Sequence, residues 1–205
     1  MKKQNYAFFS NLEEEFGDQY YLFNRFHFLK NIDDFYSAFS TRYPSVSLSH
    51  SYKTNYTPYI ATIAKSRGLY AEVVSGLEYC MALRVGYEPE NIIFNGPIKT
   101  EANLRDALLG GAIVNVDHLA EVDEVCKIAQ DHLGRKISVG FRCNADYGAR
   151  VRSRFGMAED SGELSRAFAA LQRQKISMSL EFISIHLPSG QLSPTVNALY
   201  LWLRL

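Results

Sequence analysis

The chain alternates between short apolar segments and longer helical segments, and this alternation restricts the folds that are open to it. The apolar segments are rich in β-branched residues, as is typical of strands buried on both faces. They cover residues 46–52, 70–74, 91–95, 112–116, 137–142 and 180–186. Helical stretches are expected between them, near 57–67, 76–85, 100–109, 118–133 and 162–174. The pattern predicts an α/β fold with a parallel sheet and right-handed crossovers, and both an open doubly wound sheet and a (β/α)8 barrel satisfy it.

The expected first strand is not followed by a G-x-G-x-x-G sequence, which counts against a dinucleotide-binding sheet. In a barrel, the chemistry belongs at the carboxyl ends of the strands. Several polar residues stand at or just after such ends: Lys53, Ser75, Asn95, Asp117, Arg142 and His186. The sequence therefore predicts a functional site at this edge of the predicted sheet.

Lys53 is the most informative of these residues, because it follows a predicted buried strand directly. We expect a lysine in this position to be poorly solvated, and burial lowers the pKa of an amine. A neutral amine is a nucleophile that forms a Schiff base with an aldehyde or ketone. The alternative is a surface lysine that simply ends a strand.

Five stretches together resemble the fold-type III decarboxylases that depend on pyridoxal 5'-phosphate (PLP), the group of the diaminopimelate, ornithine and arginine decarboxylases. The resemblance lies in residues 51–55 (SYKTN), 71–78 (AEVVSGLE), 92–99 (IIFNGPIK), 139–144 (VGFRCN) with 153–157 (SRFGM), and 184–190 (SIHLPSG). These motifs occur in the family's order and spacing, and the resemblance extends over roughly residues 5 to 190.

The resemblance implies an alanine racemase-like TIM barrel, of which about six of the eight strands are visible in this sequence. It implies PLP as the cofactor, an amino acid as the substrate and a homodimer for the full-length family. Lys53 would be the Schiff-base lysine, and His186 would stack on the cofactor ring. Glu72, Arg142 and Ser189 would complete the cofactor-binding set. Pro188 departs from the family, which usually has glycine there, and proline lacks a backbone N–H.

Taken from the residues alone, other interpretations stay open for some of these positions. In the alternative interpretation, Glu72 is an ordinary charged residue at the end of a strand, and His186 is a buried histidine with satisfied hydrogen bonds. Three arginines follow the fifth expected strand, Arg150, Arg152 and Arg154, and they form either a solvated loop or a binding site for a substrate carboxylate.

The chain has 205 residues, whereas a full barrel typically needs about 250. We expect a leader at 1–45, a partial PLP-binding barrel at 46–190 and an atypical tail at 191–205, where the resemblance ends. In the leader we expect a helix near 8–16 capped by Ser10 or Asn11, a strand at 20–23 and a helix at 25–42. The length suggests a truncated, frame-shifted or split decarboxylase.

Three functions remain open at this point. The first is a PLP-dependent amino-acid decarboxylase that is inactive as an isolated chain. The second is a non-catalytic truncated remnant, or an interaction partner that completes a barrel with a separate half. The third is a related racemase or PLP carrier on the same barrel.

The composition limits the classes of partner and the cellular compartment that we expect for this chain. The 22 basic and 22 acidic residues give a net charge of +0, so we expect no nucleic-acid partner. No run of residues is apolar enough to span a bilayer. The odd number of cysteines, 3, is typical of free thiols in a reducing, cytoplasmic compartment. His118 and His132 would lie about 21 Å apart on one helix, too far to share a metal ion with Cys126, and we expect no metal site.

Overall fold

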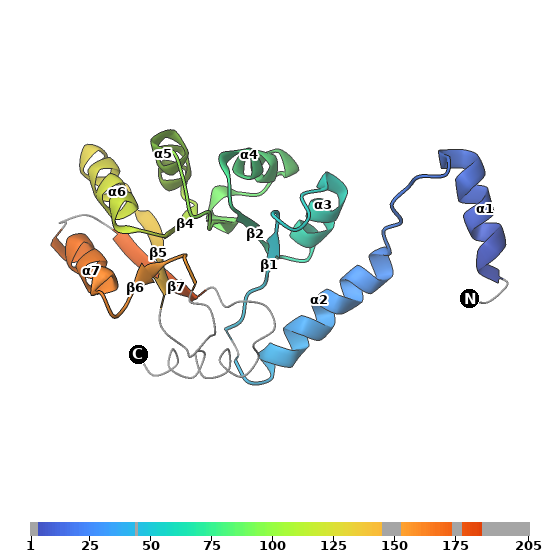
Figure 1. The fold of residues 1–205 in the computed structure, drawn as a ribbon, viewed down its shortest axis with the longest axis horizontal. Coiled ribbons are helices and arrows are strands. Elements are labelled where there is room, and N and C mark those ends of the chain that lie inside the picture. The colour runs from blue at the N-terminus through green and yellow to red at the C-terminus, as the bar shows by residue number, and fades with distance from the viewer. Residues whose placement is uncertain (1–3, 44, 145–152, 174–177, 186–205) are drawn as a thin grey trace. The chain divides into compact units, whose positions relative to one another are not determined.

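The structure is a computed structural model that describes residues 4–43, 45–144, 153–173 and 178–185 (Figure 1). The chain divides into two compact units, residues 1–47 and residues 48–205. Within the described residues, no helix is both long and apolar enough to cross a membrane.

The first unit contains two helices, α1 (Gln4–Phe16) and α2 (Arg25–Ser40). The Asn24 side chain caps α2 by accepting a hydrogen bond of 2.9 Å from the backbone N–H of His27. The predicted cap at Ser10 or Asn11 is wrong, because α1 begins earlier and includes both residues. The predicted strand at 20–23 is also wrong, since this segment has no regular structure. A strand needs a hydrogen-bonded partner, and the described residues of this unit contain no other strand.

The second unit is built on a parallel sheet whose strands follow one another in chain order from β1 to β6, with β7 paired to β5. The strands are β1 (Ser49–Ser51), β2 (Tyr70–Val73), β3 (Ile92–Phe94), β4 (Ile113–Val116), β5 (Ile137–Asn144), β6 (Met157–Ala158) and β7 (Met178–Ile185). Their six predicted counterparts are confirmed. The short strand β6 lies where only a loop was expected, and it extends the sheet by pairing with Cys143 and Asn144.

Helices connect the strands and, in Figure 1, lie in a row along the outer side of the curved sheet. They are α3 (Pro58–Ser66), α4 (Gly76–Val85), α5 (Glu101–Gly110), α6 (Leu119–Asp131) and α7 (Glu163–Arg173), with a short 3-10 helix η1 (Pro89–Asn91) before β3. All five helices that were predicted between the strands are confirmed. The α/β fold with parallel strands and alternating helices is therefore the one that the sequence pattern predicted.

The core lies between the sheet and these helices. Side chains alternate between the two faces of a strand, and the helix-facing positions are apolar and fully buried. They include Ala71, Val73, Ile92, Phe94, Val114, Val116, Ile137, Val139 and Phe141. The same alternation leaves Glu72, Asn95, Asn115 and Arg142 on the opposite face, near the carboxyl ends of their strands. The apolar packing of one face thus fixes where the polar groups of the other face stand.

Candidate functional site

A cavity of about 550 Å³ opens at the carboxyl ends of the strands, which is the size range of small-molecule sites. Its lining comes from β1, β2, β3 and β5 and the segments that follow them: Ser49, Ser51, Lys53, Thr54, Glu72, Val74, Asn95, Pro97, Arg142 and Phe155. Three of the residues predicted from the sequence, Lys53, Glu72 and Arg142, are therefore brought together at one cavity.

Lys53 lies in the turn after β1, where the backbone N–H of Thr54 donates to the carbonyl of Ser51 at 3.1 Å. The expectation that Lys53 is buried is wrong, because the side chain is exposed at the cavity. The reason is that β1 contains no buried residue, whereas every second residue of β2 beside it is buried. The amine is consequently accessible from solvent.

Glu72 belongs to a ladder of polar side chains that crosses three neighbouring strands. Its Oε1 accepts a hydrogen bond of 3.2 Å from Nδ2 of Asn95. Oδ1 of Asn95 in turn accepts a hydrogen bond of 2.5 Å from Nδ2 of Asn115. Parallel pairing of β2, β3 and β4 brings these three residues to the same edge of the sheet. The carboxylate of Glu72 is therefore held by the strand beside it.

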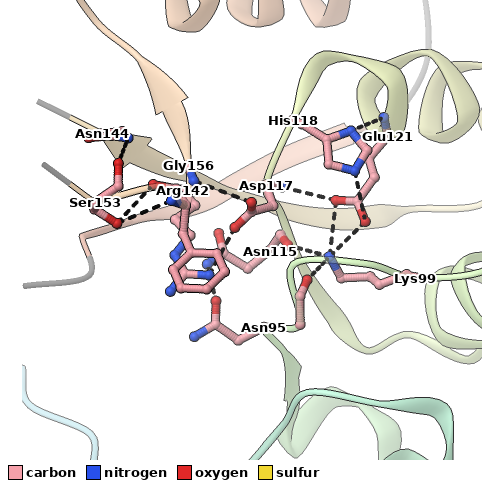
Figure 2. A network of polar contacts seen from close by, with 12 residues as sticks. Asn95, Lys99, Asn115, Asp117, His118, Glu121, Arg142, Asn144, Ser153 and Gly156 are labelled. Atoms are coloured by element: carbon pink, nitrogen blue, oxygen red, sulfur yellow. Dashed lines mark hydrogen bonds and ion pairs between the residues drawn. The ribbon is translucent and has the colours of Figure 1, made fainter.

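Arg142 is buried at the end of β5 and is fixed from two sides (Figure 2). Its Nη1 donates to Oδ1 of Asp117 at 2.9 Å, and its guanidinium lies 4.8 Å from the ring centroid of Phe155. The other oxygen of Asp117 accepts a hydrogen bond of 3.2 Å from the backbone N–H of Gly156. Nε of Arg142 is buried without a hydrogen-bond partner among the described residues. Such a donor is costly to leave unpaired, and a ligand oxygen would satisfy it.

Beside the cavity lining, Lys99 holds several chain segments together (Figure 2). Its Nζ donates to the carbonyl oxygens of Gly96 at 2.6 Å and Asn115 at 2.8 Å, and to both carboxylate oxygens of Glu121. Oε2 of Glu121 also accepts a hydrogen bond of 2.9 Å from the backbone N–H of Asp117. Burial lowers the pKa of Lys99, and the charge of Glu121 opposes this shift.

The remaining predicted site residues are not brought to the cavity by the described part of the chain. His186, Pro188 and Ser189 lie outside the described residues, as do Arg150 and Arg152. Arg154 is exposed, and its guanidinium lies 5.1 Å from the ring centroid of Phe155. Among the described residues, no group of three or more His, Cys, Asp or Glu side chains is arranged to hold a metal ion.

No role was predicted from the sequence for several residues that shape the site: Lys99 and Phe155, which stand within the motifs, and Asn115 and Glu121, which do not. A signal for Asn115 and Glu121 was present, because a polar residue inside an apolar strand or at an apolar helix position needs a partner. The partner itself is not visible in the sequence, since Lys99 and Glu121 are 22 positions apart.

Comparisons with known proteins identify the family of this chain. Residues 29–199 match the family described as pyridoxal-dependent decarboxylase, pyridoxal binding domain. The match continues past Gly190, where the motif resemblance ends. A diaminopimelate decarboxylase of Aquifex aeolicus is 27% identical over 189 residues, which is 87% of this chain and 43% of that protein.

Solved structures share the fold. A crystal structure of diaminopimelate decarboxylase from M. jannaschii has a TM-score of 0.84 at 23% identity, and the match covers 95% of this chain and 48% of that one. A second structure from the same organism, in complex with L-lysine, has a TM-score of 0.77 at 24% identity over 87% of this chain and 44% of that one. The chain thus spans about half the length of these relatives.

The family match covers most of the chain, and the structural neighbours have the same barrel architecture as far as this chain extends. The cofactor of the family is PLP. The chain belongs to the fold-type III pyridoxal-dependent decarboxylases, through their pyridoxal-binding domain.

Proposed function

We propose that this chain is the PLP-binding part of an amino-acid decarboxylase of the ornithine and diaminopimelate type, with Lys53 as the lysine that holds the cofactor covalently. The observation that carries the proposal is the cavity at the carboxyl ends of the strands, which an exposed lysine, a half-buried carboxylate and a buried guanidinium share. This is the edge at which barrel enzymes carry their chemistry.

The residues present fit the cofactor. An accessible primary amine at Lys53 suits the aldehyde of PLP. The positive charge of Arg142, whose Nε has no hydrogen-bond partner in the described part of the chain, suits a negatively charged oxygen on the cofactor. Glu72 supplies a hydrogen-bond acceptor on the wall of the same cavity. When bound, PLP supplies an electron sink that stabilises the negative charge left on Cα as carbon dioxide departs.

The residues of this chain would then bind and orient. Lys53 would hold the cofactor at the carboxyl end of β1, and its amine would move protons to and from Cα of the substrate. Arg142 is held rigidly by Asp117 at 2.9 Å and by the ring of Phe155, so that its charge stays in place as the ligand enters. We propose that His186 and Ser189 join this set from the segment after β7.

We propose an amino acid as the substrate, on the basis of relatives that are named diaminopimelate decarboxylases. Because this chain spans 43% of the first of these relatives, we expect the 205-residue chain to bind PLP without substantial decarboxylation by itself. We propose that activity requires the homodimer expected of the full-length family, or a separate chain that supplies the rest of the site.

A trapping experiment tests the proposal. The purified chain is incubated with PLP, reduced with borohydride, digested and analysed by mass spectrometry. We expect one pyridoxyl group on Lys53, and none there in Lys53→Ala. Lys65→Ala is the matched control, because Lys65 is an exposed lysine at the end of α3. Labelling spread over the surface lysines, with no preference for Lys53, would contradict the proposal.

A second candidate function is that of an interaction partner that completes a barrel with another chain. The observation that favours it is the position of β1, which pairs only with β2 among the described strands. An unpaired strand edge is a template for another strand. Sedimentation analysis of the chain distinguishes the two, since a monomer that captures PLP at Lys53 needs no second chain to build its cofactor site.

A further inference from the structure

The side chain of Asn95 holds the central place in the polar ladder of the cavity, and its backbone leaves it little freedom. The N–H of Asn95 donates to the carbonyl of Val73 at 2.7 Å, which ties the end of β3 to the end of β2. At the next residue, Gly96, a Cβ atom would come within 2.1 Å of the carbonyl oxygen of Val74. The two chain segments therefore approach more closely than any other residue at position 96 allows, and this fixes the point from which the Asn95 side chain extends.

The hydrogen bonds of the ladder run in one direction. An ionised carboxylate only accepts hydrogen bonds, so the group that Asn95 presents to Oε1 of Glu72 must be its NH2, at 3.2 Å. The amide oxygen of Asn95 then faces Nδ2 of Asn115 at 2.5 Å. Asn115 is almost fully buried, and Nζ of Lys99 donates a hydrogen bond of 2.8 Å to its backbone carbonyl oxygen. The orientation of the Asn95 amide is consequently set from both ends.

We propose that Asn95 is a positioning residue of the cofactor cavity, which orients the carboxylate of Glu72 toward the bound ligand. The proposal rests on the proposed PLP site, whereas the hydrogen bonds of Asn95 with Glu72 and Asn115 are observed without any ligand. Asn95 is proposed to act on the ligand through Glu72, to which one of the two N–H groups of its side-chain amide donates. Its effect on ligand binding should therefore act through Glu72.

Two independent measurements on the 205-residue chain test this inference. The first needs no cofactor and uses Asn95→Asp, which places a second carboxylate within hydrogen-bond distance of Glu72. Adjacent carboxylates in the folded state hold a proton more tightly than they do in the unfolded chain. The folded variant therefore binds more protons, and its stability relative to wild type should fall as the pH rises from 5 to 8.

The control for this measurement is the exchanged pair, Glu72→Gln with Asn95→Asp. It keeps one amide, one carboxylate and the hydrogen bond between them, so the difference from wild type should stay constant with pH. The other charged groups around the ladder are unchanged in every variant: Lys53, Lys99, Asp117 and Arg142. The inference would be overturned if the difference in urea midpoint between Asn95→Asp and wild type were the same at every pH.

The second measurement is a double-mutant cycle on PLP capture at Lys53, with Glu72→Gln, Asn95→Ala and the combination. Loss of a hydrogen bond to a charged group is expected to weaken capture about tenfold in each single variant. If Asn95 acts through Glu72, the combination should weaken capture no further than the more severe single variant. Additive losses would mean that Asn95 binds the cofactor directly, and would overturn its role as a positioning residue.

The two measurements separate the failure of this inference from failure of the proposed function. If the wild-type chain captures no PLP at Lys53, the proposed function fails, while the pH dependence of Asn95→Asp still decides whether Asn95 orients Glu72. If wild type captures PLP and Asn95→Ala captures it equally well, the proposed function stands and the inference about Asn95 is overturned.

Discussion

The ammonium group of Lys99 donates to both carboxylate oxygens of Glu121, at 3.1 and 3.0 Å, and the two side chains are 0% and 3% exposed. Lys99 follows β3 and Glu121 lies in the first turn of α6, so this pair ties together two chain segments that are 22 positions apart. The same ammonium group holds the carbonyl of Asn115 on β4. The pair therefore fixes the carboxyl ends of two strands relative to one another.

Replacing one member of this pair should be strongly destabilising. Lys99→Met leaves the carboxylate of Glu121 buried without its countercharge, and breaking a buried pair in this way costs about 3 kcal/mol or more. Replacing both, by Lys99→Met with Glu121→Leu, should cost less than the single change, since no unpaired charge is left. Urea unfolding measures both values. The matched control is Lys127→Met, because Lys127 is 57% exposed and its carboxylate contacts are 3.9 Å long. A loss as small in Lys99→Met as in this control would refute the structural role.

Gly156 combines two requirements that only glycine meets. Its φ is +89°, and a Cβ atom would lie 2.9 Å from the carbonyl oxygen of Arg142. We expect Gly156→Ala to lower the free energy of unfolding by about 3 kcal/mol, from the strained backbone and the close contact together. It should also weaken PLP capture, because the N–H of Gly156 bonds to Asp117, which holds Arg142.

Gly134→Ala is the control for this prediction. Gly134 has a nearly equal φ of +91°, but apart from its chain neighbours no atom of the described residues lies within 4 Å of the added methyl group. It should therefore show the backbone strain alone, about 1 kcal/mol. Equal losses in the two variants would mean that the contact with Arg142 relaxes without cost.

The strands, and the face on which each of their side chains lies, could be predicted from the sequence because both follow from local patterns of apolar residues. The helix-facing residues Ala71, Val73 and Ile92 are apolar, and the residue between the first two, Glu72, must then face the other way. The position of Lys53 after a strand follows from the same periodicity. Its exposure does not, because exposure depends on how much of β1 its neighbours cover.

The contacts that hold the site in place could not be predicted from the sequence, because they depend on how distant segments pack. The contacts of Lys99 with Gly96, Asn115 and Glu121 join three segments whose approach is decided by packing. Residues 92–99 carry one of the motifs, but a motif indicates the type of chemistry and does not identify the hydrogen-bond partners of its residues. The strand predicted at 20–23 failed because pairing, like these contacts, is a property of the folded chain.

Two buried tyrosines offer a test at alkaline pH. Tyr52 and Tyr87 are almost fully buried, and their hydroxyl groups have no hydrogen-bond partner among the described residues. Burial raises the pKa of Tyr52 to about 12, from an ordinary value of 10.0, and raises that of Tyr87 as well. The unfolded chain therefore releases these protons at a lower pH than the folded chain does, and stability should fall as the pH rises above about 10.

Tyr52→Phe should remove part of this pH dependence, which amounts to about 2 kcal/mol by pH 12 for a group shifted this far. At neutral pH the same change should be neutral or stabilising by about 1 kcal/mol, because it deletes a buried hydroxyl that no described residue pairs with. Unfolding by urea at pH 8 and at pH 11 measures both effects. Tyr56→Phe, at an exposed position, is the control. A wild-type-like alkaline profile in Tyr52→Phe would show that Tyr52 does not contribute.

Asp117 links the support to the cavity, and Asp117→Asn should separate charge from shape. The amide fits the same space, but it withdraws the negative charge that faces Arg142 at 2.9 Å, where both side chains are less than a tenth exposed. We expect a loss of about 3 kcal/mol in the free energy of unfolding, because the guanidinium is left buried with a weaker partner. We also expect weaker PLP capture at Lys53, since Arg142 is no longer held in place. Asp123→Asn, at an exposed position on α6, is the control. Arg142→Met with Asp117→Asn should regain part of the lost stability without regaining capture. If that double variant captured PLP as well as wild type, the charge of Arg142 would have no part in binding the cofactor.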